Sequence, residues 1–369
     1  MKKITIPLLI AILIFGCSKN IENTTYNESN TVLIKKAGIN TFAQIKLAKY
    51  DTTNARKYLV YKPITQKERD SLSQHNIALL ASTSCQNLNF YNSEYLDYSQ
   101  QIHLKFFYKT TTTSQNRPTL TVSVDDGWVL VGGGAWAHDY NGNGGWLVKS
   151  YPMDDGNTWY GESKDHIIQD PHCLTVFAIG LKINGVDPAY LKSNRFIRKA
   201  SSTSTSEFPT RTAILPDDYI LVGGGASIRY NGYGNMLVAS YPTNLSTWYA
   251  SGKSYRRSDP SYIDTYAIGL RNINYSSSGG SLYLQVTFRQ TSESAPANQE
   301  GLCYAPVWDG YALTCPGGYT QYTNYGRMLV SLHPQDTPAD ANVSDKDTPV
   351  YPDSGTLSAI AVGIEKRPY

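Results

Sequence analysis

The chain has little excess of charge of either sign. Lys and Arg number 33, Asp and Glu number 30, and charged residues make up only 17% of the sequence, for a formal net charge of +3. Proteins that bind nucleic acid or an acidic membrane surface usually carry a strong positive field. The charge balance therefore argues against nucleic acid as a partner.

Long hydrophobic runs are missing except at the amino terminus. There Lys2 and Lys3 precede an apolar run at 4–15, which is too short to span a bilayer as a helix and has the layout of a secretory signal. The stretch Ile14-Phe15-Gly16-Cys17 resembles the lipobox of bacterial lipoproteins. The resemblance implies cleavage before Cys17, lipidation there and attachment to a membrane. Ser18, in place of an acidic residue, favours the outer membrane or cell surface, and an ordinary cleaved signal peptide is the alternative.

Cysteine is scarce, with five residues in the whole chain. After Cys17, the remaining four are Cys85, Cys173, Cys303 and Cys315, which in an oxidising compartment allow three pairings. We expect a Cys303–Cys315 disulfide, because these two lie on candidate neighbouring strands of one repeat, and Cys85–Cys173 by default. No CxxC pair or Cys/His cluster indicates zinc, so we predict no metal and no cofactor.

The composition divides the chain into four parts. Residues 1–17 are the expected signal peptide with its lipobox, and the polar stretch 18–32 has no periodicity and is typical of a flexible tether. Residues 33–100 have a mixed pattern, with a capping-box sequence at 65–68 and a short helix expected over 72–80. Residues 101–369 form a repeat region.

Tyrosine and glycine are abundant, with 29 of each, and both gather in an internal repeat. The sequence VGGGAWAHDYNGNGGWLVKSYP begins at Val131, VGGGASIRYNGYGNMLVASYP begins at Val222, and a diverged copy, TCPGGYTQYTNYGRMLVSLHP, begins at Thr314. Each copy ends in an apolar segment such as AIGL, which gives three repeats at about 102–185, 190–273 and 281–366.

The closing segments alternate with a period of two. In the first, Phe177, Ile179 and Leu181 alternate with the small Ala178 and Gly180. This pattern predicts strands whose small face lets another backbone come close. We therefore predict an all-β repeat domain, either closed into one pseudo-threefold unit or built as three tandem β-sandwiches, with a small mixed segment before it.

The glycine triplet does not fit a phosphate loop. Gly132-Gly133-Gly134 continues into Ala135 and a strand-like run, whereas a phosphate loop needs Lys and a following helix. A β-bulge or tight bend where strands cross is the favoured interpretation. The nearby Asn-Gly pairs are typical of hairpin turns. A calcium loop is disfavoured, because its last ligand position would be Ser150 and no helices flank it.

Enzyme signatures are sparse. The six histidines form no metal-binding HExxH, and no nucleophile elbow is present. A pair of carboxylates for glycoside hydrolysis could still form between different repeats. The sequence therefore favours a protein that binds over one that catalyses.

An aromatic-then-lysine element recurs in the repeats and is the candidate ligand site. Tryptophan and tyrosine rings stack on sugars, and lysine, aspartate and histidine bind hydroxyl groups. The alternative is that the tryptophans are core and the lysines form surface ion pairs. The candidate residues are Trp136, Tyr140, Trp146, Trp159, Tyr160, Lys164, Asp165, His166, Trp248, Tyr249 and Lys253.

The motifs VGGGA, SYP and AIGL resemble short Gly-triplet β-repeats of secreted and surface proteins of bacteria. More distantly, the three strand-rich units over 101–366 look like the threefold β-prism of vitelline-membrane-type proteins. This resemblance implies a closed fold, and no activity is carried over from it. We expect a lipid-anchored surface binding protein for glycan. A glycan-degrading hydrolase and a structural or adhesive envelope protein are the alternatives.

Overall fold

The structure is a computed structural model that describes the backbone of two N-terminal strands, together with residues 85, 94–138, 144–276, 281–322, 326–335, 340–347 and 352–367. The chain divides into two compact units, Met1–Ala81 and Ser82–Tyr369. In the first, strands β1 (Ala43–Lys46) and β2 (Val60–Pro63) pair antiparallel. The predicted signal, lipobox, tether and helix at 72–80 lie outside the described residues.

The second unit contains the three repeats, and each contributes six strands in the described residues. The first repeat follows the short β3 (Glu94–Leu96) and consists of β4 (Ile102–Thr110), β5 (Thr119–Ser123), β6 (Val129–His138), β7 (Trp146–Pro152), β8 (Thr158–Lys164) and β9 (Cys173–Ile183). The second consists of β10 (Arg195–Ser201), β11 (Thr210–Ile214), β12 (Tyr219–Arg229), β13 (Asn235–Asn244), β14 (Thr247–Ser254) and β15 (Tyr262–Arg271). The third consists of β16 (Leu284–Ala295), β17 (Gly301–Pro306), β18 (Ala312–Tyr322), β19 (Met328–Pro334), β20 (Asp340–Lys346) and β21 (Gly355–Lys366).

A short helix, α3 (Pro188–Ser193), links the first repeat to the second. The Asp187 side chain accepts a hydrogen bond from the Ala189 amide at 2.9 Å, and Pro188 occupies the first turn, where its missing N–H costs nothing.

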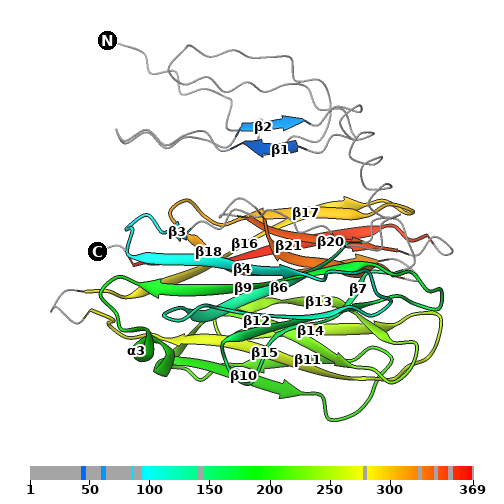
Figure 1. The fold of residues 1–369 in the computed structure, drawn as a ribbon, viewed down its shortest axis with the longest axis horizontal. Helices are drawn as coiled ribbons and strands as arrows, with labels where there is room; N and C mark the ends of the chain where they lie inside the picture. Colours follow the sequence, from blue (N-terminus) through cyan, green and yellow to red (C-terminus); the bar gives the residue numbers. More distant parts are fainter. Residues whose placement is uncertain are drawn as a thin grey trace. The chain divides into compact units, whose positions relative to one another are not determined.

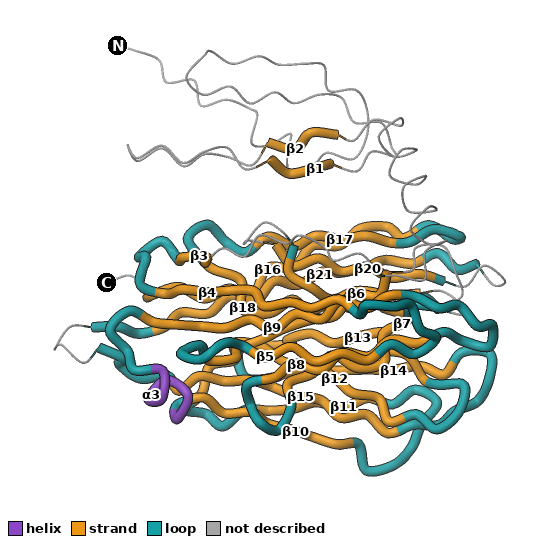
Figure 2. Tube along the Cα trace, viewed as in Figure 1, coloured by secondary structure: helices purple, strands orange, loops and turns teal. Residues whose placement is uncertain are grey.

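The repeats share their sheets in a cycle (Figures 1 and 2). The first sheet has the order β10-β15-β12-β7-β8-β5, the second β11-β14-β13-β18-β21-β16, and the third β17-β20-β19-β6-β9-β4-β3. Each sheet joins three strands of one repeat to three strands of the repeat before it, and the third repeat pairs in this way with the first. The all-β prediction is confirmed, and of its two forms the structure has the closed one.

The middle strands of the three sheets meet at the centre of this cycle, where the first glycine of each triplet lies. A Cβ on Gly132 would stand 2.0 Å from the Thr314 carbonyl oxygen, and one on Gly223 would stand 2.3 Å from that of Val131. Both carbonyls belong to a different sheet. Packed sheets are normally about 10 Å apart, so glycine is required here because it lets backbones touch. A β-bulge precedes the triplet in β6 and in β12, as the sequence predicted.

The second glycine of each triplet makes room for a ring. A Cβ on Gly133 or on Gly224 would lie 2.3 Å from the indole of Trp159 or Trp248, respectively, in the core of its own repeat. In the third repeat Pro316 replaces the middle glycine, and the register places Ala341 where the other repeats have tryptophan. Proline, which is larger than the glycine it replaces, is thus accompanied by alanine, which is smaller than tryptophan.

One disulfide prediction is confirmed and the other is wrong. Cys85 and Cys173 are joined, with their Cα atoms 5.8 Å apart, whereas Cys303 and Cys315 are both free and buried. The repeat alignment predicts Cys303 and Cys315 on neighbouring strands, but β17 and β18 belong to different sheets. The Cys315 thiol instead lies at the centre of the cycle, 3.5 Å from the Gly224 carbonyl oxygen.

Candidate functional site

The structure places most of the predicted tryptophans in the core. Trp146, Trp159 and Trp248 are at most 1% exposed. The indole N–H groups of Trp159 and Trp248 donate to the hydroxyls of Ser150 and Ser240 at 3.0 Å. Their rings are therefore packing groups in this structure and present no face to a ligand.

The lysines of the element connect one repeat to the next. The Lys164 ammonium donates to the Tyr233 carbonyl oxygen of the second repeat, and the Lys253 ammonium stands 3.9 Å from the ring centroid of Tyr322 in the third. Lys346 completes the cycle, 5.0 Å from the Trp146 ring of the first repeat. The three lysines therefore form inter-repeat contacts, and they are buried where we had considered surface ion pairs.

Burial changes the ionisation of two of these lysines. Desolvation lowers the pKa of Lys164 to about 8, and the nearby positive charge of Arg117 adds to this effect. Desolvation also lowers the pKa of Lys253 to about 8. A cation over a tyrosine ring recovers part of the lost hydration energy.

Aspartates that the sequence analysis missed shape the loops that the lysines contact. The Asp259 carboxylate accepts from the amides of Gly232 and Gly234 at 3.0 and 2.6 Å, and Asp353 accepts from the Gly326 amide at 2.7 Å. Asp259 precedes a proline shortly after the lysine of its repeat, as does Asp170 in the first repeat. This Asp-Pro pair was the available signal.

Asp165 and His166 are also buried. Asp165 accepts a long hydrogen bond of 3.4 Å from the Asp170 amide, and one ring nitrogen of His166 lies 3.1 Å from the Tyr233 carbonyl oxygen. Desolvation lowers the pKa of His166. His166 thus belongs to the contact between repeats, whereas the hydrogen bond of Asp165 lies within the first repeat.

The tyrosines that neighbour the core tryptophans point the other way, onto the outer faces of the sheets. Tyr160 is half-buried and, by register, stands beside Tyr151, then Gly225 and then Tyr266 across the first sheet. Side chains two strands apart are normally separated by about 10 Å. The rings of Tyr151 and Tyr266 nevertheless stack with centroids 4.9 Å apart, because Gly225 between them has no side chain.

The other two sheets repeat this row with different residues. The second sheet has Tyr249, Tyr241, Gly317 and Ile360, and the half-buried Tyr319 lies 4.7 Å from Tyr241.

In the third sheet His333 and Phe177 stack at 5.3 Å over Gly134. Trp136 is half-buried there and stacks on His138 at 4.1 Å. Burial lowers the pKa of His138 to about 3 and that of His333 to about 4, so both rings are neutral.

Charged side chains adjoin the tyrosine row of the first sheet. Glu162 forms an ion pair with Lys149 at 2.7 Å and accepts hydrogen bonds from the hydroxyls of Tyr230 and Tyr160 at 2.7 and 3.1 Å. Burial and the Glu162 charge raise the pKa of both tyrosines, so they stay protonated.

A second carboxylate on this face, Asp264, lies 3.3 Å from both Lys199 and Arg229.

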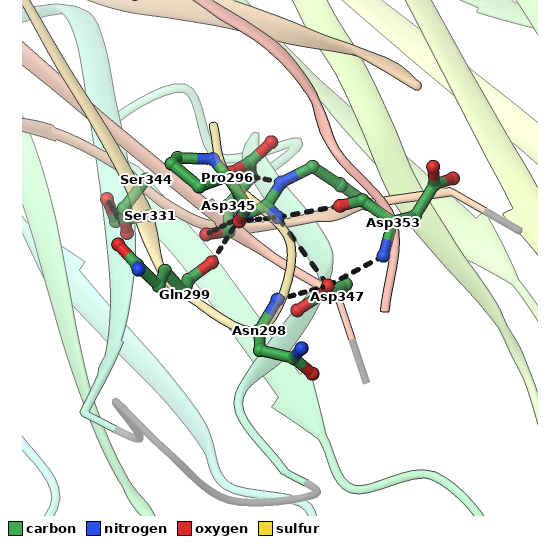
Figure 3. A network of polar contacts seen from close by, with 9 residues as sticks. Pro296, Asn298, Gln299, Ser331, Ser344, Asp345, Asp347 and Asp353 are labelled. Atoms are coloured by element: carbon green, nitrogen blue, oxygen red, sulfur yellow. Dashed lines mark hydrogen bonds and ion pairs between the residues drawn. The ribbon is translucent and has the colours of Figure 1, made fainter. Parts of the chain in front are cut away.

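The third repeat contains a buried polar network of another kind (Figure 3). The fully buried Arg327 bonds Asp345 at 3.0 Å and the carbonyl oxygens of Pro296 and Asp353, each at 3.0 Å. Asp347 accepts from the Asn298 amide at 2.9 Å. The guanidinium joins four segments of the repeat, which indicates a structural role.

Of the predicted site residues, Trp136, Tyr160 and Tyr249 lie on outer faces, Tyr140 lies outside the described residues, and the others are buried. The half-buried Tyr151 and Tyr241 and the buried Tyr266 were not among the predicted site residues. The SYP motif contained the first two and was the available signal.

No helix in the described part of the chain is long and apolar enough to cross a membrane. A scan against protein-family models finds no match. A search of the curated proteins finds none either.

Proposed function

We propose that the protein is an exported, lipid-anchored binding protein whose ligand is a carbohydrate polymer held on the outer faces of the first and second sheets. One observation carries the proposal. Tyr151 pairs with Tyr160 across two strands of the first sheet, and Tyr241 pairs with Tyr249 at the equivalent positions of the second sheet. All four side chains are half-buried. Half-exposed tyrosine rings beside polar groups are well suited to stack on sugar rings while bonding their hydroxyls.

The charges support binding more than hydrolysis. Glu162 and Asp264, two carboxylates of the first face, are held in ion pairs. Two strands, β7 and β12, separate the strands that carry them. Glycoside hydrolysis needs a carboxylic acid that can donate a proton close to a second carboxylate.

Two related faces on one anchored chain also suit a polymer. A chain that reaches both faces would be held more tightly than either face alone would hold it, because the second contact is intramolecular.

A glycan array with the soluble protein, starting at Ser18, tests this function. We expect binding without release of product, and Tyr160→Ala or Tyr249→Ala should weaken it by about tenfold, the effect of losing one ring–sugar contact of about 1.4 kcal/mol. Tyr98→Ala is the control, because Tyr98 is 77% exposed and lies outside both rows. Equal binding by all three variants would rule out the tyrosine faces, and released sugar would favour a hydrolase.

The anchor has a separate test. Cys17→Ala should move the protein from the membrane fraction to the soluble fraction, because the lipid is the proposed attachment. Membrane association that survives this change would contradict the lipoprotein assignment.

A further inference from the structure

The first and second outer faces share their tyrosines but differ in charge. Lys149 and Glu162 face each other in the first sheet, and the equivalent pair in the second sheet is Ala239 and Ser251. In the third sheet the pair is Ser331 and Ser344. The adjacent β-bulge, which lies at the same point in β7, β13 and β19, fixes this equivalence.

The same difference holds for the other charged positions. Asp264 corresponds to Ser358 of the second sheet, Lys199 to Gln290, and Arg229 to Gln321, by their places in the strand registers. Two sheets of the same architecture therefore form without these charges. The fold does not require them, and their presence on the first face needs another explanation.

The charges of this face do not cancel. Lys149 neutralises Glu162, and Lys199 and Arg229 share the single carboxylate of Asp264. Asp154 adds one negative charge that acts on Tyr151 and Tyr266. Arg117 is exposed and lies 5.9 Å from the Tyr230 ring, and among the described residues it has no carboxylate at ion-pair distance. The face therefore carries an excess of positive charge, which includes two exposed arginines beside half-buried rings.

We propose that the first face binds an acidic polysaccharide, with Arg229 and Arg117 receiving uronate carboxylates while Tyr151 and Tyr160 stack on the sugar rings. A guanidinium offers two parallel N–H donors that match a carboxylate, which an uncharged hydroxyl cannot replace. The second face, with serine, alanine and glutamine at the matching positions, takes neutral sugar. This inference rests on the proposed carbohydrate function and specifies its ligand.

The test compares polymers that differ only in charge. Oligomers of polygalacturonate, alginate and hyaluronate are each measured beside their carboxyl-reduced counterparts, at low and at high salt. We expect at least one acidic oligomer to bind about tenfold more tightly than its reduced form, the effect of one charged hydrogen bond, and this preference to shrink at high salt.

The variants use the second face as a template. Lys149→Ala, Glu162→Ser, Lys199→Gln, Arg229→Gln and Asp264→Ser together copy its residues onto the first face, and they should abolish the acidic preference while leaving the melting temperature within a few degrees. Arg117→Gln alone should reduce that preference. Arg271→Gln is the control, because Arg271 pairs with Asp218 away from this row. Its loss should leave the preference for acidic oligomers unchanged.

The outcomes separate the two proposals. If no oligomer of either kind binds, the carbohydrate function itself fails. If oligomers bind but acidic and reduced forms bind equally, or the charge-replaced variant keeps the preference, the carbohydrate function stands and the acidic ligand is wrong.

Discussion

Each glycine of the triplet lets a neighbouring group approach to a distance that a side chain would prevent. Its first member lies against the backbone of another sheet and its second against the tryptophan of the same repeat. Its third lies against a carbonyl of the neighbouring strand, under the stacked rings of the outer face. A phosphate loop would use glycine to expose amides, whereas here each glycine removes a Cβ that would collide.

The middle glycine should tolerate no methyl group. A Cβ in Gly224→Ala would lie 2.3 Å from the Trp248 ring and 2.4 Å from the Tyr266 carbonyl oxygen, so we expect a loss of about 3 kcal/mol in the free energy of unfolding, measured by urea titration. Gly232→Ala is the matched control, because its nearest neighbour would be 3.8 Å away, and it should change stability by less than about 0.5 kcal/mol.

Adding Trp248→Ala to Gly224→Ala should cost less than the sum of the single changes, because both act on one contact. Additive losses would show that the ring and the glycine are energetically independent.

The lowered pKa values of Lys164 and Lys253 predict that both lysines make the free energy of unfolding depend on pH in the alkaline range. Their pKa values of about 8 lie below the ordinary 10.5, so between these values the unfolded chain binds more protons than the folded one. The contribution of each lysine to stability should therefore rise with pH from about 8 to 10, by up to about 1 kcal/mol per pH unit, whereas the raised pKa of Cys315 contributes a slope of opposite sign. Above that range the raised pKa of Tyr160 also lowers stability as pH rises, because the unfolded tyrosine ionises first.

Urea titrations across this pH range measure the effect. Lys164→Met should lower the slope of stability against pH by up to about 1 kcal/mol per pH unit, and Lys192→Met, an exposed control on α3, should leave the slope unchanged. The same slope in both variants would mean that Lys164 keeps an ordinary pKa in the folded protein.

At the scale of elements, the covalent links can be checked directly. Non-reducing peptide mapping should recover Cys85 joined to Cys173, and Cys303 and Cys315 should react with a thiol reagent only after unfolding, because both are buried. Burial also raises the pKa of Cys315 to about 11, which slows its reaction further. A Cys303–Cys315 peptide would restore the pairing that the repeat alignment suggested.

Strands were predictable from sequence, but their partners were not. The alternation around Phe177 and Ala178 identified β9 because side-chain period follows directly from strand geometry. Backbone hydrogen bonds carry no comparable sequence signal, so the analysis paired strands within a repeat and placed Cys303 beside Cys315. Grouping Trp159 with Tyr160 in one site was a different error, because alternation along β8 places adjacent residues on opposite faces.

At the scale of the molecule, each repeat is incomplete alone. Strand β6 of the first repeat pairs with β19 of the third, and β13 of the second pairs with β18 of the third. The buried Lys253 and Lys346 cross the same boundaries. The second unit should therefore unfold as one cooperative body, in contrast to tandem domains, which unfold separately.

Deleting residues 281–367 tests this cooperativity. Without the third repeat, β6 and β13 lose their hydrogen-bonded neighbours, so the remaining two repeats should show no cooperative thermal transition. The full second unit should show one transition, with circular dichroism and fluorescence curves that coincide. A two-repeat fragment that melts cooperatively would indicate repeats with independent cores.

The pairing of β6 with β19 also has a consequence for the time course of folding. The two strands are separated in sequence by the entire second repeat, so the loop that must close between them is long and its closure is slow. Until β19 is available, the edge of β6 presents unpaired amides and carbonyls, which is the kind of surface on which chains join one another into aggregates. A protein built this way depends on its last third to protect its first, and so its yield should depend on chain concentration during refolding more strongly than its final stability would suggest.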